Sequence, residues 1–198
     1  NALLVSTGEA SPDAALKQLR TLAGDRASVI LLAPNVDPHV AQIAVLTGGS
    51  VARAVGSFTY TANRDGTVNP DPRWINQYIR TEQVPILGAV RCNKVMLIQL
   101  RAALTDIVKN HLASSIHRGE YGGCYVPRYI ARDPSKGLSF HTFGTAIDLN
   151  VPGNQRGTVG TIDSRVVRIF EQWGFNWGGN WRYTDPMHFE LARIVKAQ

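Results

Sequence analysis

The spacing of apolar residues along the chain predicts a mixture of helices and strands. Residues 94–112 repeat apolar side chains every three or four positions, which predicts the longest helix. A second helix is expected to begin at Asp163 or Ser164, either of which could cap it, and to end at Gly174. Shorter apolar runs bounded by turn residues predict strands elsewhere, so the chain should fold as an α+β protein.

The first third of the chain predicts a small lobe in which strands and helices alternate. Residues 2–5 and 29–33 are apolar runs typical of buried strands. Each run precedes a segment expected to be helical, residues 11–24 and residues 38–46. Residues 51–61 are expected to form a further strand.

These elements predict two domains. Residues 1–68 are expected to form an N-terminal α/β lobe, and its role cannot be inferred because it carries no phosphate-binding or dinucleotide-binding glycine pattern. Residues 69–198 are expected to form a domain in which an antiparallel sheet packs against helices. The proline-rich stretch that begins at Asn69 marks the boundary.

Two short segments of the second domain alternate between apolar and polar residues, as half-buried strands do. Asp148 lies on the polar face of residues 146–150, and His188 lies on the polar face of residues 187–191. His141 precedes a turn glycine, so the chain can double back and bring its imidazole to Asp148. Three side chains of the metal-ligand type are therefore expected to converge.

Two imidazoles and one carboxylate, with the fourth position open, are typical of a catalytic zinc site. Either segment alone is as well explained by a structural histidine and a turn-forming aspartate. Because the two segments supply complementary ligands, we predict one zinc ion per chain bound by His141, Asp148 and His188. Asp185 precedes Pro186, which favours an extended conformation, and it is expected at the rim of the site as an unbound carboxylate.

The motifs Ser-x-His-x-x-Gly-x-Ala-x-Asp, at residues 139–148, and Asp-x-x-His-Phe-Glu, at residues 185–190, resemble those of the zinc D-alanyl-D-alanine carboxypeptidase family. That family includes vancomycin-resistance-type D,D-peptidases and phage L-alanyl-D-glutamate endopeptidases. The resemblance covers roughly residues 70–195. It implies that His141, Asp148 and His188 are the zinc ligands. One departure is Asp185, at a position where carboxypeptidase branches commonly carry glutamate, and it leaves the cleaved bond open.

The resemblance also implies roles around the metal. Asp185 would be the acid and base, and Arg128 would be the arginine that precedes the first ligand and stabilises the oxyanion. Further residues are expected to contact the substrate or to support the ligands: Ser139 and Trp181 on the substrate, and Glu190 and Asn150 behind the metal.

The predicted function is that of a zinc metallopeptidase that hydrolyses peptidoglycan stem peptides through a metal-activated water, first as a D-alanyl-D-alanine carboxypeptidase. An endopeptidase of the L-alanyl-D-glutamate type and a non-catalytic wall-binding module with the zinc fold are the alternatives. The net charge of +6 favours polyanionic surroundings, such as an anionic cell wall. Nucleic acid is not expected as a partner, because no nucleic-acid-binding motif accompanies that charge.

The two cysteines, Cys92 and Cys124, lie outside any Cys-x-x-Cys pair. An even number suggests a disulfide in a secreted protein and two buried thiols in a cytosolic one. The family resemblance places the protein outside the membrane, secreted or attached to the cell envelope, and so favours the disulfide. The chain shows no signal peptide, which is expected to have been removed, and no apolar run long enough to span a membrane.

Overall fold

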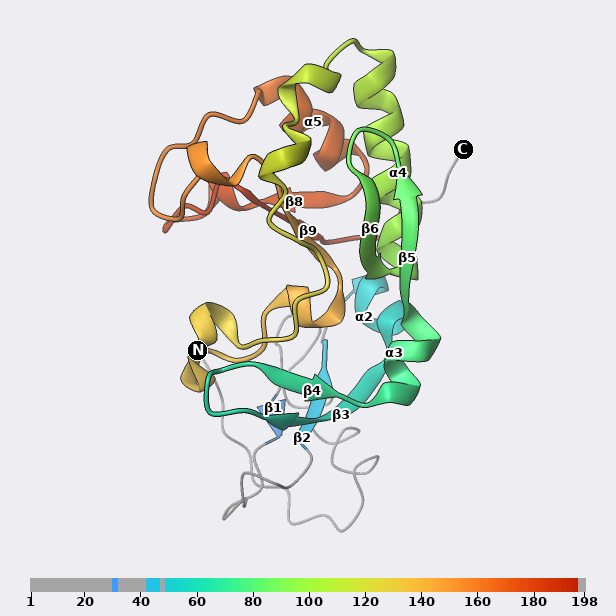
Figure 1. The fold of residues 1–198 in the computed structure, drawn as a ribbon, viewed down its shortest axis with the longest axis vertical. Helices are drawn as coiled ribbons and strands as arrows, with labels where there is room; N and C mark the ends of the chain where they lie inside the picture. The colour runs from blue at the N-terminus through green and yellow to red at the C-terminus, as the bar shows by residue number, and fades with distance from the viewer. Residues whose placement is uncertain (1–29, 32–41, 47–48, 196–198) are drawn as a thin grey trace.

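The computed structural model describes residues 30–31, 42–46 and 49–195 (Figure 1). The strand expected at residues 2–5 and the helix expected at residues 11–24 lie outside the described residues. The helices and strands of the described part are, in chain order, β1 (Ile30–Leu31), β2 (Gln42–Val45), α2 (Gly49–Val55), β3 (Ser57–Ala62), β4 (Val68–Pro70), α3 (Pro72–Tyr78), β5 (Ile79–Val84), β6 (Gly88–Asn93), α4 (Lys94–Lys109), β7 (Ala146–Asp148), α5 (Ser164–Gln172), β8 (Phe175–Trp177) and β9 (His188–Leu191). All strand pairs among them are antiparallel, which confirms the α+β class.

The N-terminal sheet has the strand order β1-β2-β3-β4 and corrects two predictions. Gln42–Val45, expected to be helical, is a strand that pairs with β3. The strand expected at residues 51–61 begins as helix α2, and only its second half is strand. Both segments are short and apolar, so their pattern fits a helix as well as a strand. Pairing with neighbouring strands decides which of the two forms. Strand β4 spans the expected boundary at residue 68, and the division into two domains stays a prediction.

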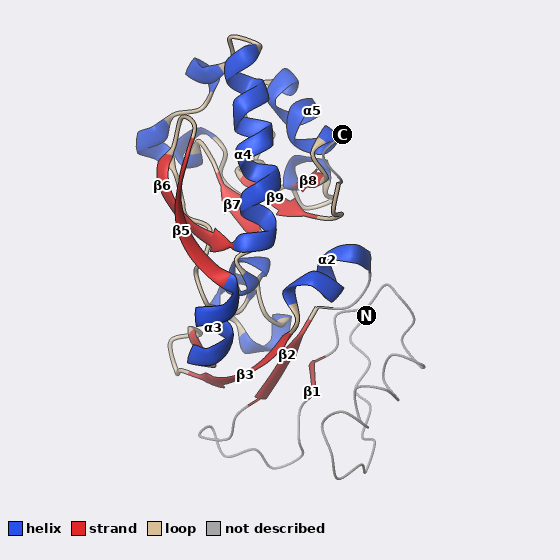
Figure 2. Ribbon diagram, turned by 90° about the vertical axis from the view of Figure 1, so that its right-hand side faces the viewer, coloured by secondary structure: helices blue, strands red, loops and turns tan. Residues whose placement is uncertain are grey.

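The β5–β6 hairpin and helix α4 form the centre of the molecule. Asn93 ends the hairpin and caps α4, because its side-chain oxygen accepts the N–H of Val95 at 3.1 Å. The helix follows the predicted apolar stripe, and the stripe is buried from Leu97 to Ile107, whereas Val108 at its end is exposed. Figure 2 shows α4 lying along the hairpin, which its contacts confirm.

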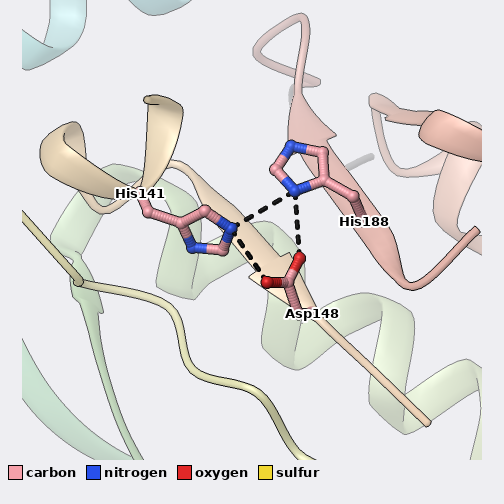
Figure 3. Close-up of side chains that lie close together, drawn as sticks. All are labelled: His141, Asp148 and His188. Carbon is pink, nitrogen blue, oxygen red and sulfur yellow. Dashed lines mark hydrogen bonds and ion pairs between the residues drawn. The ribbon is translucent and has the colours of Figure 1, made fainter. Parts of the chain in front are cut away.

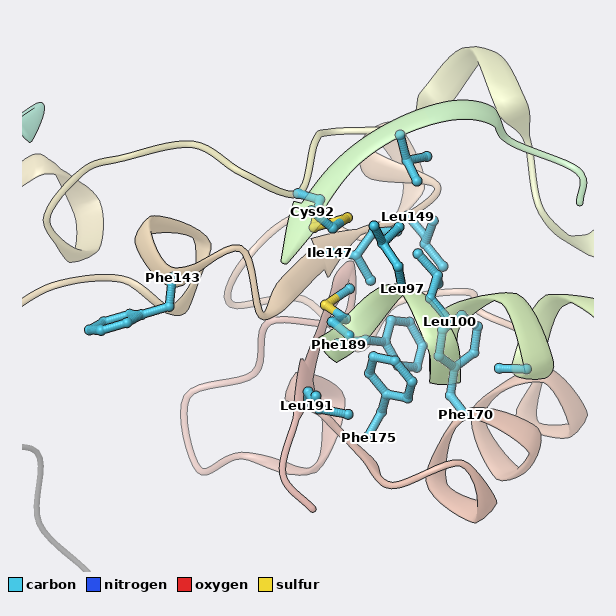
Figure 4. Close-up of a cluster of buried hydrophobic side chains, with 14 of the residues drawn as sticks. Cys92, Leu97, Leu100, Phe143, Ile147, Leu149, Phe170, Phe175, Phe189 and Leu191 are labelled. Carbon is cyan, nitrogen blue, oxygen red and sulfur yellow. A yellow bond between two sulfur atoms is a disulfide. The ribbon is translucent and has the colours of Figure 1, made fainter. Parts of the chain in front are cut away.

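The sheet that carries the predicted metal ligands has the order β7-β9-β8. Helix α5 packs on it, capped as expected by Asp163, whose carboxylate accepts the N–H of Arg165. Phe170 of α5 and Phe189 of β9 lie at the centre of the core, with ring centroids 4.5 Å apart (Figure 4). The apolar face of this sheet is therefore anchored in the core, which leaves its other face for polar side chains.

A disulfide joins Cys92 of β6 to Cys124 in the loop segment before the first ligand motif. The two residues are 32 positions apart, and both are buried. The bond ties an otherwise irregular loop to the central hairpin. No helix in the described part of the chain has the length and hydropathy needed to cross a membrane.

Candidate metal and substrate site

The pairing of β7 with β9 brings two of the expected ligands together. Asp148 and His188 are direct partners in the antiparallel register, so their side chains leave the same face of the sheet. His141 lies in a short 3-10 helix, Phe140–Phe143, that Gly144 ends in the left-handed conformation at φ 65°. This turn folds the histidine back over the strand pair, as the sequence predicted (Figure 3).

The three side chains meet closely enough to share one ion. Nε2 of His141 lies 3.2 Å from Oδ2 of Asp148, and Nδ1 of His188 lies 3.0 Å from Oδ1 of the same carboxylate. The two ring nitrogens are 3.2 Å apart, and one donor atom from each residue lies within 4.8 Å of the others. Among the described residues this is the group of histidine and acidic side chains that could bind a metal ion.

The tautomer of His141 fits a metal ligand. Its Nδ1 lies 2.9 Å from the carbonyl oxygen of Cys124, which can only accept a hydrogen bond. Nδ1 must therefore carry the proton, and in the neutral ring Nε2 directs a lone pair at Asp148 and His188. A carboxylate and an imidazole lone pair that converge at this distance suit a divalent cation.

Burial and neighbouring charges shift the pKa values of Asp148 and His188 in opposite directions. Burial would raise the pKa of Asp148, but hydrogen bonds and charge from His141 and His188 lower it well below its usual range. For His188 burial lowers the pKa, whereas the neighbouring Asp148 and Glu190 raise it, with a net result of about 9. Glu190 reaches within 3.6 Å of Nε2 of His188, an ion-pair distance longer than a hydrogen bond.

The backbones of two ligands are bonded to one segment, residues 122–126. Gly122 donates its N–H to the carbonyl of Asp148 at 2.9 Å, and Asp148 donates to the carbonyl of Gly123 at 3.1 Å. Val126 donates to the carbonyl of His141 at 3.1 Å. Because Cys124 lies in the middle of this segment, the disulfide fastens the supports of both ligands to strand β6.

The ligands form one side of a pocket of about 520 Å³. Five further residues predicted for the site line the same pocket: Arg128, Ser139, Trp181, Asp185 and Glu190. Their roles stay predictions, but the structure brings all five beside the ligand group. A cavity of this size accommodates a short peptide segment.

Asp185 lies in the pocket as a carboxylate outside the ligand group. One of its oxygens, Oδ1, is buried and has no hydrogen-bond partner among the described residues. Burial raises the pKa of Asp185, and the nearby Asp148 raises it further, against the lowering effect of His188. Its backbone is fixed, since its N–H donates to the carbonyl of Gly178 at 2.9 Å. This unpartnered carboxylate oxygen is available to accept a proton.

Arg128 is half-buried in the pocket wall. Thr142 holds its backbone from both sides, because the threonine hydroxyl accepts the N–H of Arg128 at 2.9 Å and donates to its carbonyl at 2.7 Å. Burial lowers the pKa of Arg128, while the charges of Asp148 and Asp185 raise it. The guanidinium remains charged at any physiological pH and lies in the field of both carboxylates.

Ser139 and Trp181 occupy different parts of the pocket. Ser139 is buried, and its hydroxyl oxygen accepts the N–H of His141 at 3.3 Å, which caps the short helix that carries this ligand. The ring of Trp181 lies 5.4 Å from the ring of His188, between centroids. The serine therefore supports a ligand, and the tryptophan covers one.

Asn150, expected behind the metal, has a different role. Its side chain accepts the N–H of His117 at 2.8 Å and donates to the carbonyl of Ser115 at 2.8 Å. Asn150 is left-handed at φ 49°, so its side chain turns away from the face that carries Asp148. The strand, and with it the alternation of apolar and polar side chains, ends at Asp148. Asn150 instead hydrogen-bonds to the segment that follows α4.

Sequence reasoning missed two arginines that line the pocket, Arg132 and Arg156. Arg156 lies in an exposed loop and stacks over the ring of Tyr183 at 5.2 Å. Neither residue belongs to a motif. The available signal was weak: Arg132 follows Arg128 by four residues, and Arg156 lies between the two ligand motifs.

Comparison with known proteins agrees with this geometry. Residues 132–191 match a family model described as D-alanyl-D-alanine carboxypeptidase. No curated protein and no solved structure matches the chain. The matched residues include the three ligands and Asp185, and they support a peptidase that acts on peptidoglycan. The match over residues 132–191 thus supports the resemblance of this part of the chain to the D-alanyl-D-alanine carboxypeptidase family.

Proposed function

We propose that the protein is a zinc metallopeptidase that hydrolyses peptidoglycan stem peptides. The leading candidate for its activity is that of a D-alanyl-D-alanine carboxypeptidase. The observation that carries this proposal is the pairing of an open ligand group with Asp185, a half-buried carboxylate whose Oδ1 is buried and has no partner among the described residues. A purely structural metal site is normally closed by four protein ligands and has no need of such a carboxylate. The same point argues against the alternative of a non-catalytic wall-binding module.

His141, Asp148 and His188 would hold the ion through Nε2, a carboxylate oxygen and Nδ1, the atoms that face one another. A bound zinc ion would supply a water whose pKa is lowered to about 7, and a Lewis acid for the peptide carbonyl. The chain's own task is to hold these three donors in place, and residues 122–126 do so through the backbone.

Asp185 would accept the proton of the attacking water and then pass it to the leaving amine. Its raised pKa helps the carboxylate to accept the proton of the water, and the leaving amine, as the stronger base, can then take that proton from it. Arg128 would donate to the carbonyl oxygen as negative charge develops on it. Trp181 and Ser139 would shape the pocket around the reacting bond.

Two further arginines bear on the chemistry of the substrate. Arg132 and Arg156 line the pocket with Arg128, and a peptide with a free carboxylate beside the reacting bond is the substrate that such a cluster favours. A terminal D-alanine and a γ-linked D-glutamate both carry such a carboxylate, so the cluster fits the carboxypeptidase and the endopeptidase equally. The presence of aspartate rather than glutamate at position 185 keeps the endopeptidase as the alternative.

Two observations support an extracellular or envelope location. The disulfide between Cys92 and Cys124 is stable in an oxidising compartment. The net charge of +6 favours association with an anionic cell wall.

The test is digestion of purified stem pentapeptides and intact muropeptides, followed by mass spectrometry of the products. Loss of one terminal alanine identifies the carboxypeptidase, and cleavage between L-alanine and D-glutamate identifies the endopeptidase. The protein treated with a chelator serves as control, and zinc should restore its activity. If the zinc-loaded protein leaves every stem peptide intact, the proposed function is wrong.

A further inference from the structure

One wall of the pocket is a single stretch of chain, residues 127–132, here called the arginine wall because it carries Arg128 and Arg132. It has little regular structure of its own. Ala131 and Arg132 are both left-handed, at φ 53° and φ 58°. This conformation costs a residue with a Cβ about 1 to 2 kcal/mol, so two in succession persist only where the surroundings hold them.

The arginine wall is held from two sides. Residues 137–142 bond to its backbone, with the N–H of Ser139 donating to the carbonyl of Arg128 at 3.0 Å, and the N-terminal sheet holds the other side. The turn between β3 and β4, residues 63–68, lies against the wall. Val68 donates its N–H to the carbonyl of Pro127 at 3.2 Å, and Tyr129 donates its N–H to the carbonyl of Gly66 at 3.0 Å. Between these bonds Thr67 and Arg128 form an antiparallel bridge. In Figure 1 the yellow segment after α4 reaches the tip of this hairpin.

Gly66 is the point of closest approach. It is buried, with φ 78°, and a Cβ built on it would overlap the carbonyl oxygen of Arg132. The turn therefore fits against the wall where the wall backbone is left-handed, and only glycine fits there. The neighbouring Asp65 lies 3.8 Å from the guanidinium of Arg132, and it accepts the N–H of Thr67 at 3.0 Å, which shapes the turn.

Tyr129 anchors the wall to the same sheet through its side chain. It is buried, its hydroxyl lies 3.4 Å from the side-chain oxygen of Gln42 on β2, and its ring meets the ring of Tyr60 on β3 edge-on at 6.3 Å. The metal ligands are held differently, by the β7–β9 pairing and by residues 122–126. The two halves of the pocket thus have different main supports, and they meet at Thr142, whose hydroxyl bonds to the backbone of Arg128 beside the ligand His141.

We propose that the turn at residues 63–68 is a positioning element of the active site, which sets Arg128 for catalysis without touching substrate. This proposal rests on the proposed peptidase function. It gives the N-terminal sheet a role that the sequence alone did not reveal. Displacing the turn should reduce stabilisation of the transition state by Arg128, whereas the metal ligands should stay in place.

The test compares Gly66→Ala with Gly119→Ala, a matched control in which the added Cβ meets nothing within 4 Å. Gly66→Ala should lower kcat by about tenfold or more, with the zinc content unchanged, and Gly119→Ala should match the wild type. In an Arg128→Ala background, Gly66→Ala should cost no more than about twofold, because the group that it positions is already absent. If Gly66→Ala lowers kcat equally in the wild-type and Arg128→Ala proteins, the turn contributes only to stability and the proposal is overturned.

A second pair of variants covers the case in which Gly66→Ala does not fold. Asp65→Ala removes the hydrogen bonds that shape the turn, and Asp65→Asn keeps an oxygen acceptor for the N–H of Thr67. We expect Asp65→Ala to lower kcat and Asp65→Asn to recover most of it. Equal kcat values for Asp65→Ala and the wild type would contradict the proposal.

Amide hydrogen exchange provides a readout that needs no turnover. In Gly66→Ala, or in Asp65→Ala, the amides of Tyr129 and Val68 should exchange at least about tenfold faster, and those of Gly122 and Asp148 should keep their wild-type rates. Unchanged exchange at Tyr129 would overturn the positioning role. If the wild-type protein cleaves no stem peptide, the proposed function fails, and the exchange rates still decide whether the turn holds the wall.

Discussion

The ligand group and the arginine wall face the same pocket but are built in opposite ways. His141 is 1% exposed at its side chain and Asp148 is 14% exposed, whereas the side chain of Arg132 is 55% exposed. Asp148 and His188 lie on a short regular sheet whose other face is packed in the core, and His141 lies in the short 3-10 helix beside it. The wall follows irregular backbone with two left-handed residues and depends on a turn far away in the sequence.

For the proposed peptidase, this difference predicts that metal binding and transition-state stabilisation can be separated by mutation. Buried donors in a fixed strand register lose little entropy on binding an ion, and their charges act strongly because water is excluded. The end of the wall at Ala131 and Arg132 is exposed and its backbone is left-handed, so its position is easier to disturb. Mutations on the two sides should therefore give different signatures, with loss of metal on one side and loss of rate with metal retained on the other.

The largest effect should come from removing a ligand. His141→Ala should abolish zinc binding at stoichiometric concentrations and lower kcat/KM by at least about a thousandfold, because the ion both activates water and polarises the carbonyl. Metal analysis after gel filtration, together with the stem-peptide assay, checks this. His111→Asn, at an exposed histidine outside the pocket, is the control. A His141→Ala protein that keeps one zinc per chain would remove the ligand assignment.

Variants of Asp185 test whether a carboxylate outside the metal-ligand group transfers a proton in the reaction. Asp185→Ala should keep one zinc per chain and lose about a hundredfold to ten-thousandfold in kcat, the range of general acid–base catalysis. Asp185→Glu, which restores the residue common in carboxypeptidases, should recover part of the loss. Turnover of Asp185→Ala at the wild-type rate would exclude the proton-transfer role.

The wall itself is tested at Arg128. Arg128→Ala should lower kcat by about a hundredfold to a thousandfold, which is typical for removal of one oxyanion donor, with zinc content and unfolding midpoint near the wild type. Arg128→Lys should recover only part, since an ammonium lacks the planar fork of the guanidinium. If Arg128→Ala instead loses zinc, the two sides of the pocket are not separable and the comparison fails.

The disulfide sharpens the comparison on the ligand side. Replacing Cys92 and Cys124 together with serine opens a 32-residue link and should lower the free energy of unfolding by about 3 to 4 kcal/mol. Because residues 122–126 support Asp148 and His141, zinc affinity should fall as well. Urea unfolding in a chelator and competition with a zinc indicator measure the two effects. Unchanged zinc affinity would show that the strand register alone holds the ligands.

The smallest effect concerns the helix behind the ligand sheet. Hydrogen bonds from Arg165 lower the pKa of Asp163, the cap of α5, to about 2. A lowered folded-state pKa contributes stability that is present above the unfolded value of 3.8 and is lost as the pH falls through about 2. Asp163→Asn should remove this dependence between those pH values, as thermal unfolding at a series of pH values would show. A parallel pH profile for both proteins would contradict the assignment.

Much of this architecture could be read from local pattern. Helix α4 follows its apolar stripe, α5 begins at its capping residue Asp163, and the alternation around Asp148 and His188 predicts the two ligand strands. The N-terminal sheet was harder to predict from the sequence. Gln42–Val45 is a strand only because it pairs with β3, and such pairing leaves little trace in four residues.

In the site, too, some residues could be predicted from local pattern and others could not. Asn150 was assigned to the ligands by extending the alternation of β7, but the left-handed backbone there turns its side chain to the loop after α4. Arg156 enters the pocket on a loop without periodicity or motif, so nothing in the sequence marks it.

By itself the sequence determined the kinds of chemistry present: two imidazoles, an aspartate on a strand face, a second aspartate before a proline, and an upstream arginine. These follow from residue identity and short-range periodicity, which a few neighbouring residues decide. Only the tertiary structure decided which of these groups share a pocket, which are buried without a partner, and that a turn of the N-terminal sheet supports the arginine wall. Those facts depend on contacts between residues far apart in the chain, where the gain from burial and backbone pairing outweighs local preference.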